Sequence, residues 1–256
     1  MNKISGRCVW IIGASSGLGR ALAIALAESG NYVIASARSQ TALAELALQH
    51  PGKIKILPLD VGHQLDLENA SLQLRNITDY LDMVICAAGI CEYEDNLHFD
   101  PSMYERTIDI NFLGVVRILH IALPLLKHAQ HRAQFAAISS LSTCIGLPRA
   151  EAYGASKSAL NYFMQSLRAD LAKLPIDLSL IRPGFIATDL VKNNDFAMPF
   201  LMTPEQASTR IIKALTKRKF LVDFPKRLSW TLTLAGFFFN AWCKWVAPKL
   251  TRIHKF

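Results

Sequence analysis

The sequence predicts an α/β fold in which helices cover both faces of a doubly wound parallel sheet. Three observations lead to this prediction. Short β-rich runs alternate with helix-like segments along the chain. Runs such as VWII, YVIA and MVICA are continuously apolar, which is typical of strands buried on both faces. The strict alternation favours parallel strands, because parallel neighbours need a helical crossover between them.

The composition supports one sizeable core. Of the 256 residues, 51% are hydrophobic and 19% are charged, so disorder is not expected. The five cysteines form no CxxC pair, which predicts reduced, mostly buried thiols in a cytoplasmic protein. The first predicted strand begins at Arg7, which leaves no room for a signal peptide before it.

Each predicted strand is a short β-rich run. In chain order the seven runs are Arg7–Ile12, Tyr32–Ala37, Ile54–Leu59, Asp82–Cys86, Gln134–Ser139, Asp177–Ile181 and Phe220–Asp223. The helical patterns between them include Gly17–Ser29, Thr41–Gln49, Ser102–His128, Tyr153–Lys173 and Pro204–Lys217. No repeat or low-complexity linker interrupts this order, so residues 1–225 are predicted to form a single domain.

The turn after the first strand is rich in glycine and serine. Gly13 permits a tight turn, while Gly17 and Gly19 let the backbone approach a pyrophosphate and let the helix pack on the sheet. Ser15 and Ser16 can cap the helix or donate to phosphate. The spacing is GxxxGxG rather than the more general GxGxxG, so a plain strand-to-helix turn stays an alternative.

The ends of the next two strands refine the predicted dinucleotide. The second strand ends without an acidic residue, and Arg38 follows Ala37. An arginine at this place can neutralise a 2′-phosphate, which favours NADP(H) over NAD(H); a solvated surface arginine is the alternative. Asp60 follows the third strand, where it can accept from an adenine amino group or cap the next helix.

A serine, a tyrosine and a lysine form the predicted catalytic group. Tyr153 and Lys157 are four residues apart on one helix face, and Ser140 lies thirteen residues before the tyrosine. A nearby ammonium is expected to lower the pKa of the phenol, and a serine hydroxyl can hold a carbonyl oxygen beside it. Together these groups can give a proton to a carbonyl while a hydride arrives from a nicotinamide.

With these motifs, the chain from roughly Gly6 to Asp223 resembles the short-chain dehydrogenase/reductase family. The resemblance implies a Rossmann-type sheet of about seven strands and an NADP-dependent oxidoreductase acting on CH–OH or C=O groups. It also implies a homodimer or homotetramer assembled through helices of the body. Arg38 matches the NADP-preferring type of this family.

The resemblance also implies site residues. Asn111, in INFLG (Ile110–Gly114), matches the asparagine that completes a tetrad with Ser140, Tyr153 and Lys157 and helps to hold a water in a proton relay. The lysine also binds the nicotinamide ribose in this family. The implied cofactor-binding residues are Gly13, Ser15, Ser16, Gly17, Leu18, Gly19, Arg38, Asp60, Val61, Ala87, Ala88, Gly89, Tyr153, Lys157, Pro183, Gly184, Ile186 and Thr188.

One motif departs from the family pattern. The usual NNAG after the fourth strand reads CAAG at Cys86–Gly89, so the hydrogen bonds of the two asparagines must be replaced. No metal site is predicted, because His128 and His131 lack an accompanying carboxylate or cysteine cluster.

The substrate side is predicted to be apolar. Residues 188–204 correspond to the family's substrate lid and contain Phe196, Met198, Phe200, Leu201 and Met202. We therefore expect a small lipophilic ketone or aldehyde; a 3-oxoacyl chain, a sterol-like ketone and a sphingoid precursor stay open. These side chains could instead simply pack the lid onto the body.

Residues 226–256 form a separate apolar and cationic tail. The net charge is +8, and no acidic residue follows Asp223, whereas the body is nearly neutral. No nucleic-acid motif accompanies this charge, so nucleic-acid binding is not expected. Ser229, Thr233, Gly236, Asn240 and Lys244 form a narrow, weakly polar stripe on an otherwise apolar helix pattern. Peripheral contact with the inner face of a membrane, packing on the protein or a partner, and a true span stay open, the last least favoured.

Three functional hypotheses follow. The leading one is carbonyl reduction, or the reverse alcohol oxidation. A non-catalytic NADP-binding sensor or membrane scaffold would be expected to show a broken tetrad. An epimerase or dehydratase on the same fold would recycle its cofactor.

Overall fold

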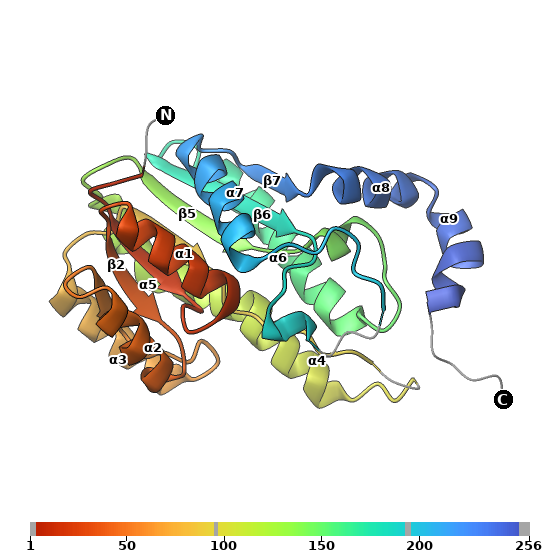
Figure 1. The fold of residues 1–256 in the computed structure, drawn as a ribbon, viewed down its shortest axis with the longest axis horizontal. Coiled ribbons are helices and arrows are strands. Elements are labelled where there is room, and N and C mark those ends of the chain that lie inside the picture. The colour runs from red at the N-terminus through yellow and green to blue at the C-terminus, as the bar shows by residue number, and fades with distance from the viewer. Residues whose placement is uncertain (1–3, 95–96, 193–195, 251–256) are drawn as a thin grey trace.

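The strands are buried on both faces, as their uninterrupted apolar sequences predict. Trp10 and Ile12 enter the core on one side of the sheet, while Val9 and Ile11 enter the core on the other. The computed structural model describes residues 4–94, 97–192 and 196–250 (Figure 1). In these residues the strands are β1 Cys8–Ile12, β2 Tyr32–Ser36, β3 Ile54–Ile56, β4 Met83–Cys86, β5 Ala133–Ile138, β6 Ile176–Pro183 and β7 Leu221–Phe224.

All strand pairs are parallel, and the sheet order is β3-β2-β1-β4-β5-β6-β7. This order confirms the doubly wound, seven-stranded prediction. The direction of strand addition reverses between β1 and β4, and ligands bind at such a switch point, outside the carboxyl ends of the strands. The predicted strand Ile54–Leu59 is longer than β3, whose register with β2 ends at Ile56, although the Leu57 and Leu59 nitrogens still donate to the Ala35 and Ala37 oxygens.

Two layers of helices cover the sheet. One core packs against α1 Gly17–Glu28, α2 Gln40–Gln49 and α7 Pro204–Thr216. The other packs against α3 Gln64–Ile77, α5 Gly114–Lys127 and α6 Glu151–Asp170, with α4 Pro101–Ile108 lying against α6.

The predicted helix Ser102–His128 is interrupted. A π-helical turn, Asp109–Leu113, separates α4 from α5. The continuous segment Pro101–Lys127 is also the helix among the described residues that is long and apolar enough to cross a membrane. Its α5 part buries Ile118 and Ala122 in the core of the domain, which accounts for its apolar sequence.

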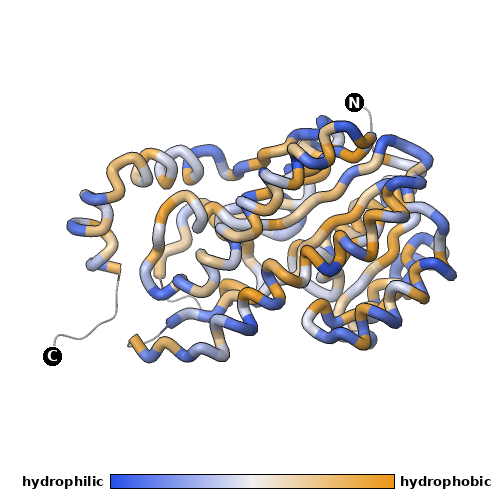
Figure 2. Tube along the Cα trace, turned by 180° about the vertical axis from the view of Figure 1, so that it is seen from behind, coloured by the Kyte–Doolittle hydropathy of each residue, from blue (hydrophilic) through white to orange (hydrophobic). Residues whose placement is uncertain are grey.

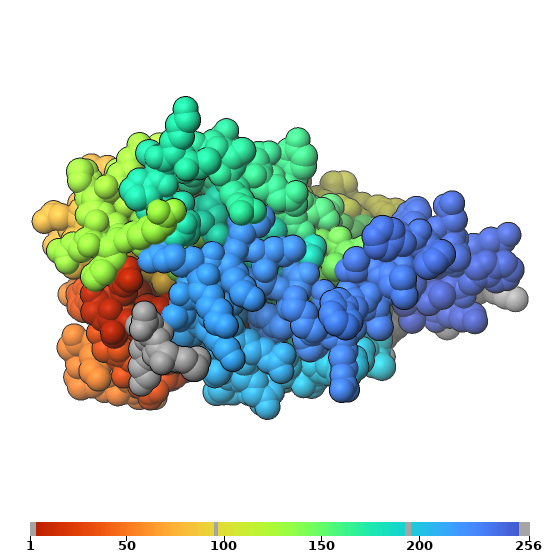
Figure 3. Space-filling view, turned by 90° about the horizontal axis from the view of Figure 1, so that it is seen from above, coloured from red at the N-terminus to blue at the C-terminus, as the bar shows by residue number. Residues whose placement is uncertain are grey.

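The chain ends in an arm, residues 226–250, that leaves the sheet after β7. It contains α8 Lys226–Phe237, a short α9 Phe239–Ala241, a π-helical turn Trp242–Val246 and a 3-10 turn Ala247–Leu250. Figures 1 and 3 show this arm extending beyond the body of the molecule.

Candidate active site

The segments predicted to bind cofactor and substrate all follow the carboxyl ends of strands. They therefore meet at one edge of the parallel sheet. The glycine-rich turn follows β1, the CAAG segment follows β4, Ser140 follows β5 and Pro183 ends β6.

The glycine turn is packed too closely to accept side chains. Gly13 has φ +88°, and a Cβ there would lie 2.6 Å from the Ala88 nitrogen. A Cβ on Gly19 would collide with the Gly13 carbonyl oxygen. Gly17 has φ +51°, and its Cβ would lie 2.8 Å from the Thr188 methyl group. The turn thus joins the segments after β1, β4 and β6 around one space.

The first turn of α1 leaves donors available at this space. Its first backbone bond inside the helix runs from the Arg20 nitrogen to the Ser16 oxygen. The N–H groups of Gly17, Leu18 and Gly19 come before this bond and therefore have no partner within the helix. No acidic side chain occupies this turn, and Ser16 makes no side-chain capping bond. These features suit an anionic phosphate. Gly13 and Ala14 differ, because both nitrogens donate to the Ser36 oxygen.

Asn111 joins the segment after β4 to α6. Its side-chain oxygen accepts from the Ile90 nitrogen at 2.8 Å, and its Nδ2 donates to the Ile90 oxygen at 2.9 Å and to Ser156 Oγ at 3.0 Å. Ser156 Oγ in turn donates to the Tyr153 backbone oxygen at 2.7 Å. The fully buried Asn111 side chain therefore ties the backbone at Ile90 to α6 beside Tyr153.

The CAAG departure has a visible consequence. The Ala87 nitrogen donates to the Ile12 oxygen at 2.9 Å, so backbone pairing continues past β4 without asparagine side chains. A Cβ on Gly89 would lie 3.0 Å from Asn111 Oδ1 and 3.4 Å from Lys157 Nζ. Gly89 therefore keeps the backbone close to both polar groups.

Lys157 carries its amine into the interior. The residue is 4% exposed, and Nζ donates to the Ile138 oxygen at 2.9 Å. Burial lowers the pKa of this amine to about 8, since removing water disfavours the charged form. Nζ also lies 5.9 Å from the centre of the Tyr153 ring, so the two side chains share one face of α6.

The pKa of Tyr153 departs from the expectation. Burial raises the pKa of the phenol above its ordinary value, and the nearby Cys91 thiol adds to this rise. A hydrogen bond with Ser140 acts in the opposite direction but is the weaker effect. The predicted lowering of this pKa is therefore wrong, because desolvation is the largest effect on the phenol. The phenol stays protonated and able to donate.

A side-chain network holds the loop around Ser140 against α6. The sequence did not predict this network. Ser139 Oγ donates to Asn161 Oδ1 at 2.6 Å, and Asn161 Nδ2 donates to Thr143 Oγ1 at 2.8 Å. Thr143 Oγ1 donates to the Ser140 backbone oxygen at 2.7 Å. Asn161 lies one helical turn beyond Lys157 on α6, so its i+4 spacing from the lysine was the available signal.

The segment after β6 crosses the edge of the sheet. Gly184 N donates to the Phe224 oxygen at 2.8 Å, and Ile186 forms a parallel bridge with Met202. Met202 is buried, so this lid residue packs onto the body rather than lining an apolar surface. Phe196 makes edge contacts with Tyr93, at 5.8 Å between ring centres, and with Phe185, at 6.0 Å. Residues 193–195 of the predicted lid lie outside the described residues.

The residues predicted to meet the adenosine end lie farther along the edge. Arg38 is exposed just after β2. Asp60 Oδ1 accepts from the Gly62 nitrogen at 2.9 Å, which shapes the loop after β3. Arg117 Nη1 donates to the Val61 oxygen at 3.0 Å and ties this loop to α5.

The short chain dehydrogenase family model matches residues 7–198. This chain belongs to the short-chain dehydrogenase family. An uncharacterized oxidoreductase of Myxococcus xanthus is 32% identical over 236 residues, covering 90% of this chain and 91% of that protein. A fatty acyl-CoA reductase of Acinetobacter baylyi is 31% identical over 239 residues, covering 89% of this chain and 77% of that protein.

A solved structure agrees with the fold of this short-chain dehydrogenase. A family member from Burkholderia phymatum, in complex with NAD, has a TM-score of 0.83 and 18% sequence identity, covering 91% of this chain and 94% of that chain. The family membership makes the protein an oxidoreductase. Asn111 and Lys157 both lie next to Gly89, Lys157 lies next to the Tyr153 ring, and Ser140 lies close to the Tyr153 phenol.

His131 of this short-chain dehydrogenase contributes to the fold. The His131 backbone nitrogen donates to Asp82 Oδ1 at 2.9 Å, and its ring Nδ1 lies 3.2 Å from the same oxygen. Asp82 is buried beside β1, where its other oxygen accepts from the Cys8 nitrogen. His131 therefore has a structural partner at the end of the sheet opposite the site.

Proposed function

We propose that this short-chain dehydrogenase is an NADPH-dependent carbonyl reductase that acts on lipophilic ketones or aldehydes, or on the corresponding alcohols in reverse. One observation carries the proposal. The Tyr153 phenol lies close enough to Ser140 for that hydroxyl to lower the pKa of the phenol, and it lies beside the buried Lys157, at the sheet edge where α1 presents its open first turn.

The glycine-rich turn after β1 fits a dinucleotide. A Cβ at Gly17 would meet Thr188, and a Cβ at Gly89 would meet Asn111 and Lys157, so glycine keeps the backbone close to these side chains. In the proposal, the first turn of α1 holds the pyrophosphate, Asp60 and Val61 the adenine, and Lys157 the nicotinamide ribose. The remaining proposed contacts are Gly13, Ser15, Ser16, Gly17, Leu18, Gly19, Ala87, Ala88, Gly89, Tyr153, Pro183, Gly184, Ile186 and Thr188.

The four polar residues would divide the chemistry. A bound NADPH supplies the hydride that reduces the carbonyl carbon. Ser140 holds the carbonyl oxygen, and Tyr153 transfers its phenolic proton to that oxygen. Lys157 stabilises the phenolate that is left, and Asn111 fixes the backbone through Ile90 and Ser156. In the reverse direction the phenolate accepts the alcohol proton.

The preference for NADPH is proposed from Arg38. Its exposed guanidinium follows β2 and the uncharged residues Ser36 and Ala37. No carboxylate stands at these two positions to bind the 2′-hydroxyl of an NAD ribose. The first measurement is a fluorescence titration with NADPH and NADH. We expect tighter binding of NADPH, and Arg38→Ala should remove most of the difference. Equal affinities in the unaltered protein would contradict the cofactor preference.

The lipophilic substrate is proposed from the aromatic contacts beside the site. Tyr93, Phe185 and Phe196 come from the segments after β4 and β6, and Phe200 and Leu201 expose further apolar surface on the lid. The fatty acyl-CoA reductase relative is consistent with such a substrate. A screen of aldehydes of increasing chain length should show kcat/KM rising with length; a preference for short polar carbonyls would contradict it.

Tyr153→Phe tests the catalytic assignment. Loss of the phenolic proton should lower turnover by about 10²–10⁴-fold, the usual contribution of a general acid. NADPH binding should survive, because the ring remains. Tyr162→Phe, which removes an exposed hydroxyl from the same helix, is the matched control. Unchanged activity in Tyr153→Phe would contradict the mechanism.

Net consumption of NADPH separates the reductase from the alternatives. An epimerase or dehydratase returns the cofactor to its starting state, and a non-catalytic NADP-binding sensor or scaffold consumes none. The proposal also places residues 1–225 in one catalytic unit, with 188–204 as its lid, in a cytoplasmic homodimer or homotetramer. A contact between the 226–256 tail and a membrane surface is a separate proposal that does not depend on the chemistry.

A further inference from the structure

The C-terminal arm turns apolar side chains outward. On α8, Trp230, Leu234 and Phe237 lie at the i, i+4, i+7 spacing of one helix face and are 73%, 59% and 81% exposed. Beyond α8, Phe238 and Trp245 are also exposed. Figure 2 shows hydrophobic residues along the projecting arm, and Figure 3 shows it reaching past the body. Large exposed apolar surfaces are typical of contact sites.

The first part of the weakly polar side of the arm, at Ser229, Thr233 and Gly236, contacts the body. Asn240 and Lys244, farther along that side, are exposed. Ser229 is buried, and its Oγ donates to Asp223 Oδ2 at 3.2 Å. A Cβ on Gly236 would lie 2.8 Å from the Cys144 oxygen. Farther along, Trp242 Nε1 donates to the Gly146 oxygen at 2.9 Å. These contacts fix the rotation of the arm, so its outward apolar face is a property of the fold. A helix in water would present the opposite pattern.

Basic side chains flank the apolar face. Lys226 and Arg227 are exposed at the start of α8, and Lys244 and Lys249 are exposed beyond its end. The sequence holds no acidic residue after Asp223. Pairing with the arm of a second copy would bring like charges together, whereas anionic lipid headgroups would neutralise them. The charge pattern therefore favours lipid over a second arm.

The shape of the arm excludes a straight span. Leu228–Cys243 contains 16 uncharged residues, fewer than the roughly 20 that cross a bilayer as a helix. The helix α8 also ends at Phe237, and Figure 1 shows α9 running in a different direction. We propose that residues 226–250 are an in-plane anchor that binds the surface of an anionic lipid bilayer through Trp230, Leu234 and Phe237 and their basic flanks.

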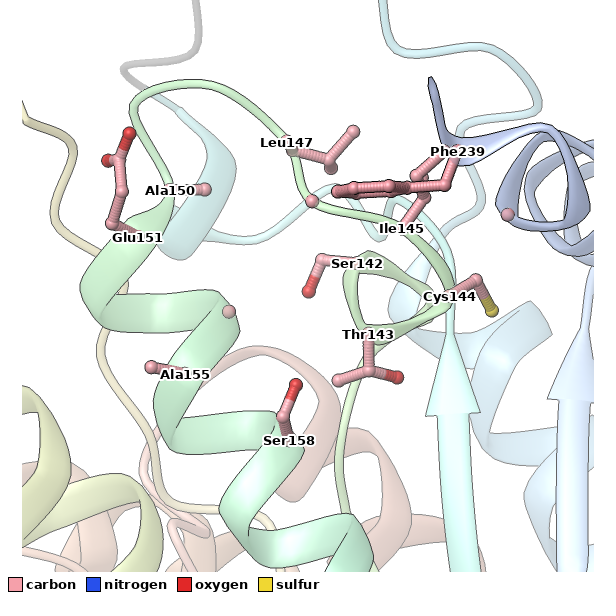
Figure 4. A pocket seen from close by; sticks show the side chains of 13 residues that line it. Ser142, Thr143, Cys144, Ile145, Leu147, Ala150, Glu151, Ala155, Ser158 and Phe239 are labelled. Carbon is pink, nitrogen blue, oxygen red and sulfur yellow. The ribbon is translucent and has the colours of Figure 1, made fainter. Parts of the chain in front are cut away.

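The anchor is joined to the catalytic loop. A pocket of about 420 Å³ lies between the loop that follows Ser140, the start of α6 and the inner side of the arm. Its wall includes Ile145, Leu147, Gly236 and Phe239, and Figure 4 shows the Phe239 ring beside the two loop residues. A bilayer on the outer face of the arm would thus lie next to this pocket. If the proposed function holds, a lipophilic substrate can reach the catalytic loop from the lipid.

Flotation with vesicles tests the anchor. The full chain is mixed with vesicles of phosphatidylcholine alone, or with about 30% phosphatidylglycerol, at low and high salt. The variant Trp230→Ser/Phe237→Ser removes the apolar face. The matched control Leu48→Ser/Leu72→Ser removes two exposed leucines from α2 and α3. Circular dichroism and NADPH binding establish that each variant is folded, so a failed catalytic assignment does not affect the result.

We expect the unaltered chain and the leucine control to float with the anionic vesicles, at least about tenfold more than with phosphatidylcholine, and to lose binding at high salt. Trp230→Ser/Phe237→Ser should stay at the bottom of the gradient. Equal flotation of this variant would overturn the proposal. So would a chain that binds no vesicles but forms dimers that the same variant dissociates, since the face would then serve a second copy.

Discussion

At the scale of single residues, Lys157 shows how burial sets both stability and charge. Its amine donates to one carbonyl oxygen, and its pKa falls from 10.5 to about 8 because little water reaches it. The unfolded chain therefore binds a proton between pH 8 and 10.5 that the folded chain has released. The free energy of unfolding must rise with pH across this window, by on the order of 3 kcal/mol for this group alone.

Urea unfolding of the protein and of Lys157→Met measures this effect. The difference in unfolding free energy between the two should be constant below pH 7 and should move in favour of the lysine between about pH 8 and 10. The ammonium is lost over the same window, so we expect turnover to fall as stability rises. A difference that does not change with pH would show that the amine titrates at its ordinary pKa.

Two helical glycines of this chain should respond oppositely to the same methyl group. Gly19→Ala places a Cβ against the Gly13 carbonyl oxygen, a rigid backbone atom, so α1 must move away from the turn. In Gly154→Ala the added Cβ meets no atom within 4 Å, and the substitution reduces the conformational freedom of the unfolded chain at this position of α6. We expect Gly154→Ala to stabilise by roughly 0.5–1 kcal/mol and Gly19→Ala to lose both stability and NADPH affinity. Thermal unfolding and cofactor titration compare them, and a stable Gly19→Ala that binds NADPH normally would contradict the close packing.

At the scale of elements, the 3-10 turn Leu141–Cys144 is held to α6 by the side chain of Thr143. Thr143→Val keeps the shape but removes the donor to the Ser140 oxygen and the acceptor for Asn161. Leaving these groups unpaired should cost roughly 1–3 kcal/mol of stability. We also expect kcat to fall while NADPH affinity holds, because Ser140 loses its support.

Thr143→Ser retains both hydrogen bonds and serves as the rescue. It should recover most of the turnover that Thr143→Val loses. If Thr143→Val were destabilised yet turned over at the full rate, the network would hold the fold without positioning the serine.

The sequence anticipated those elements whose own residues set their structure. Seven apolar runs became seven strands, because a buried parallel strand needs no alternating pattern. The helix Gln64–Ile77 was missed since its face is narrow and its composition polar, with only Leu67, Ala70 and Leu74 buried. The π-helical turn at Asn111 could not be predicted from the sequence either. It accompanies bonds from Asn111 to Ile90 and Ser156, which are distant in sequence.

The candidate site also has features that local sequence patterns predict and features that depend on the whole fold. The glycine spacing and the pair Tyr153 and Lys157 are local patterns, and the sequence alone located them. The direction of the Tyr153 pKa depends on how much water the whole fold excludes, which no spacing reports. The inward side of the arm likewise depends on Cys144 and Gly146, which lie 89 and 96 residues before their partners Thr233 and Trp242.

At the scale of the whole molecule, the outer face of α6 is the place where the proposed homo-oligomer can form. Tyr162 is 76% exposed there, and the small side chains of Ser166 and Ala169 lie exposed on the same face at helical spacing. Small residues around one large aromatic ring allow a second helix to approach closely. In a two-fold assembly each copy offers the same face, so the Tyr162 ring of one copy is covered by the α6 face of the other.

Tyr162→Arg should therefore dissociate the assembly, because a two-fold contact brings the two introduced charges toward one another in a desolvated interface. Sedimentation velocity should show an oligomer for the unaltered chain and a monomer for this variant, with the fold intact. Trp230→Ser/Phe237→Ser should leave the sedimentation coefficient unchanged, since its face is assigned to lipid. A monomeric unaltered chain would contradict the homo-oligomer. An oligomer that resists Tyr162→Arg would place the contact on another face of the body.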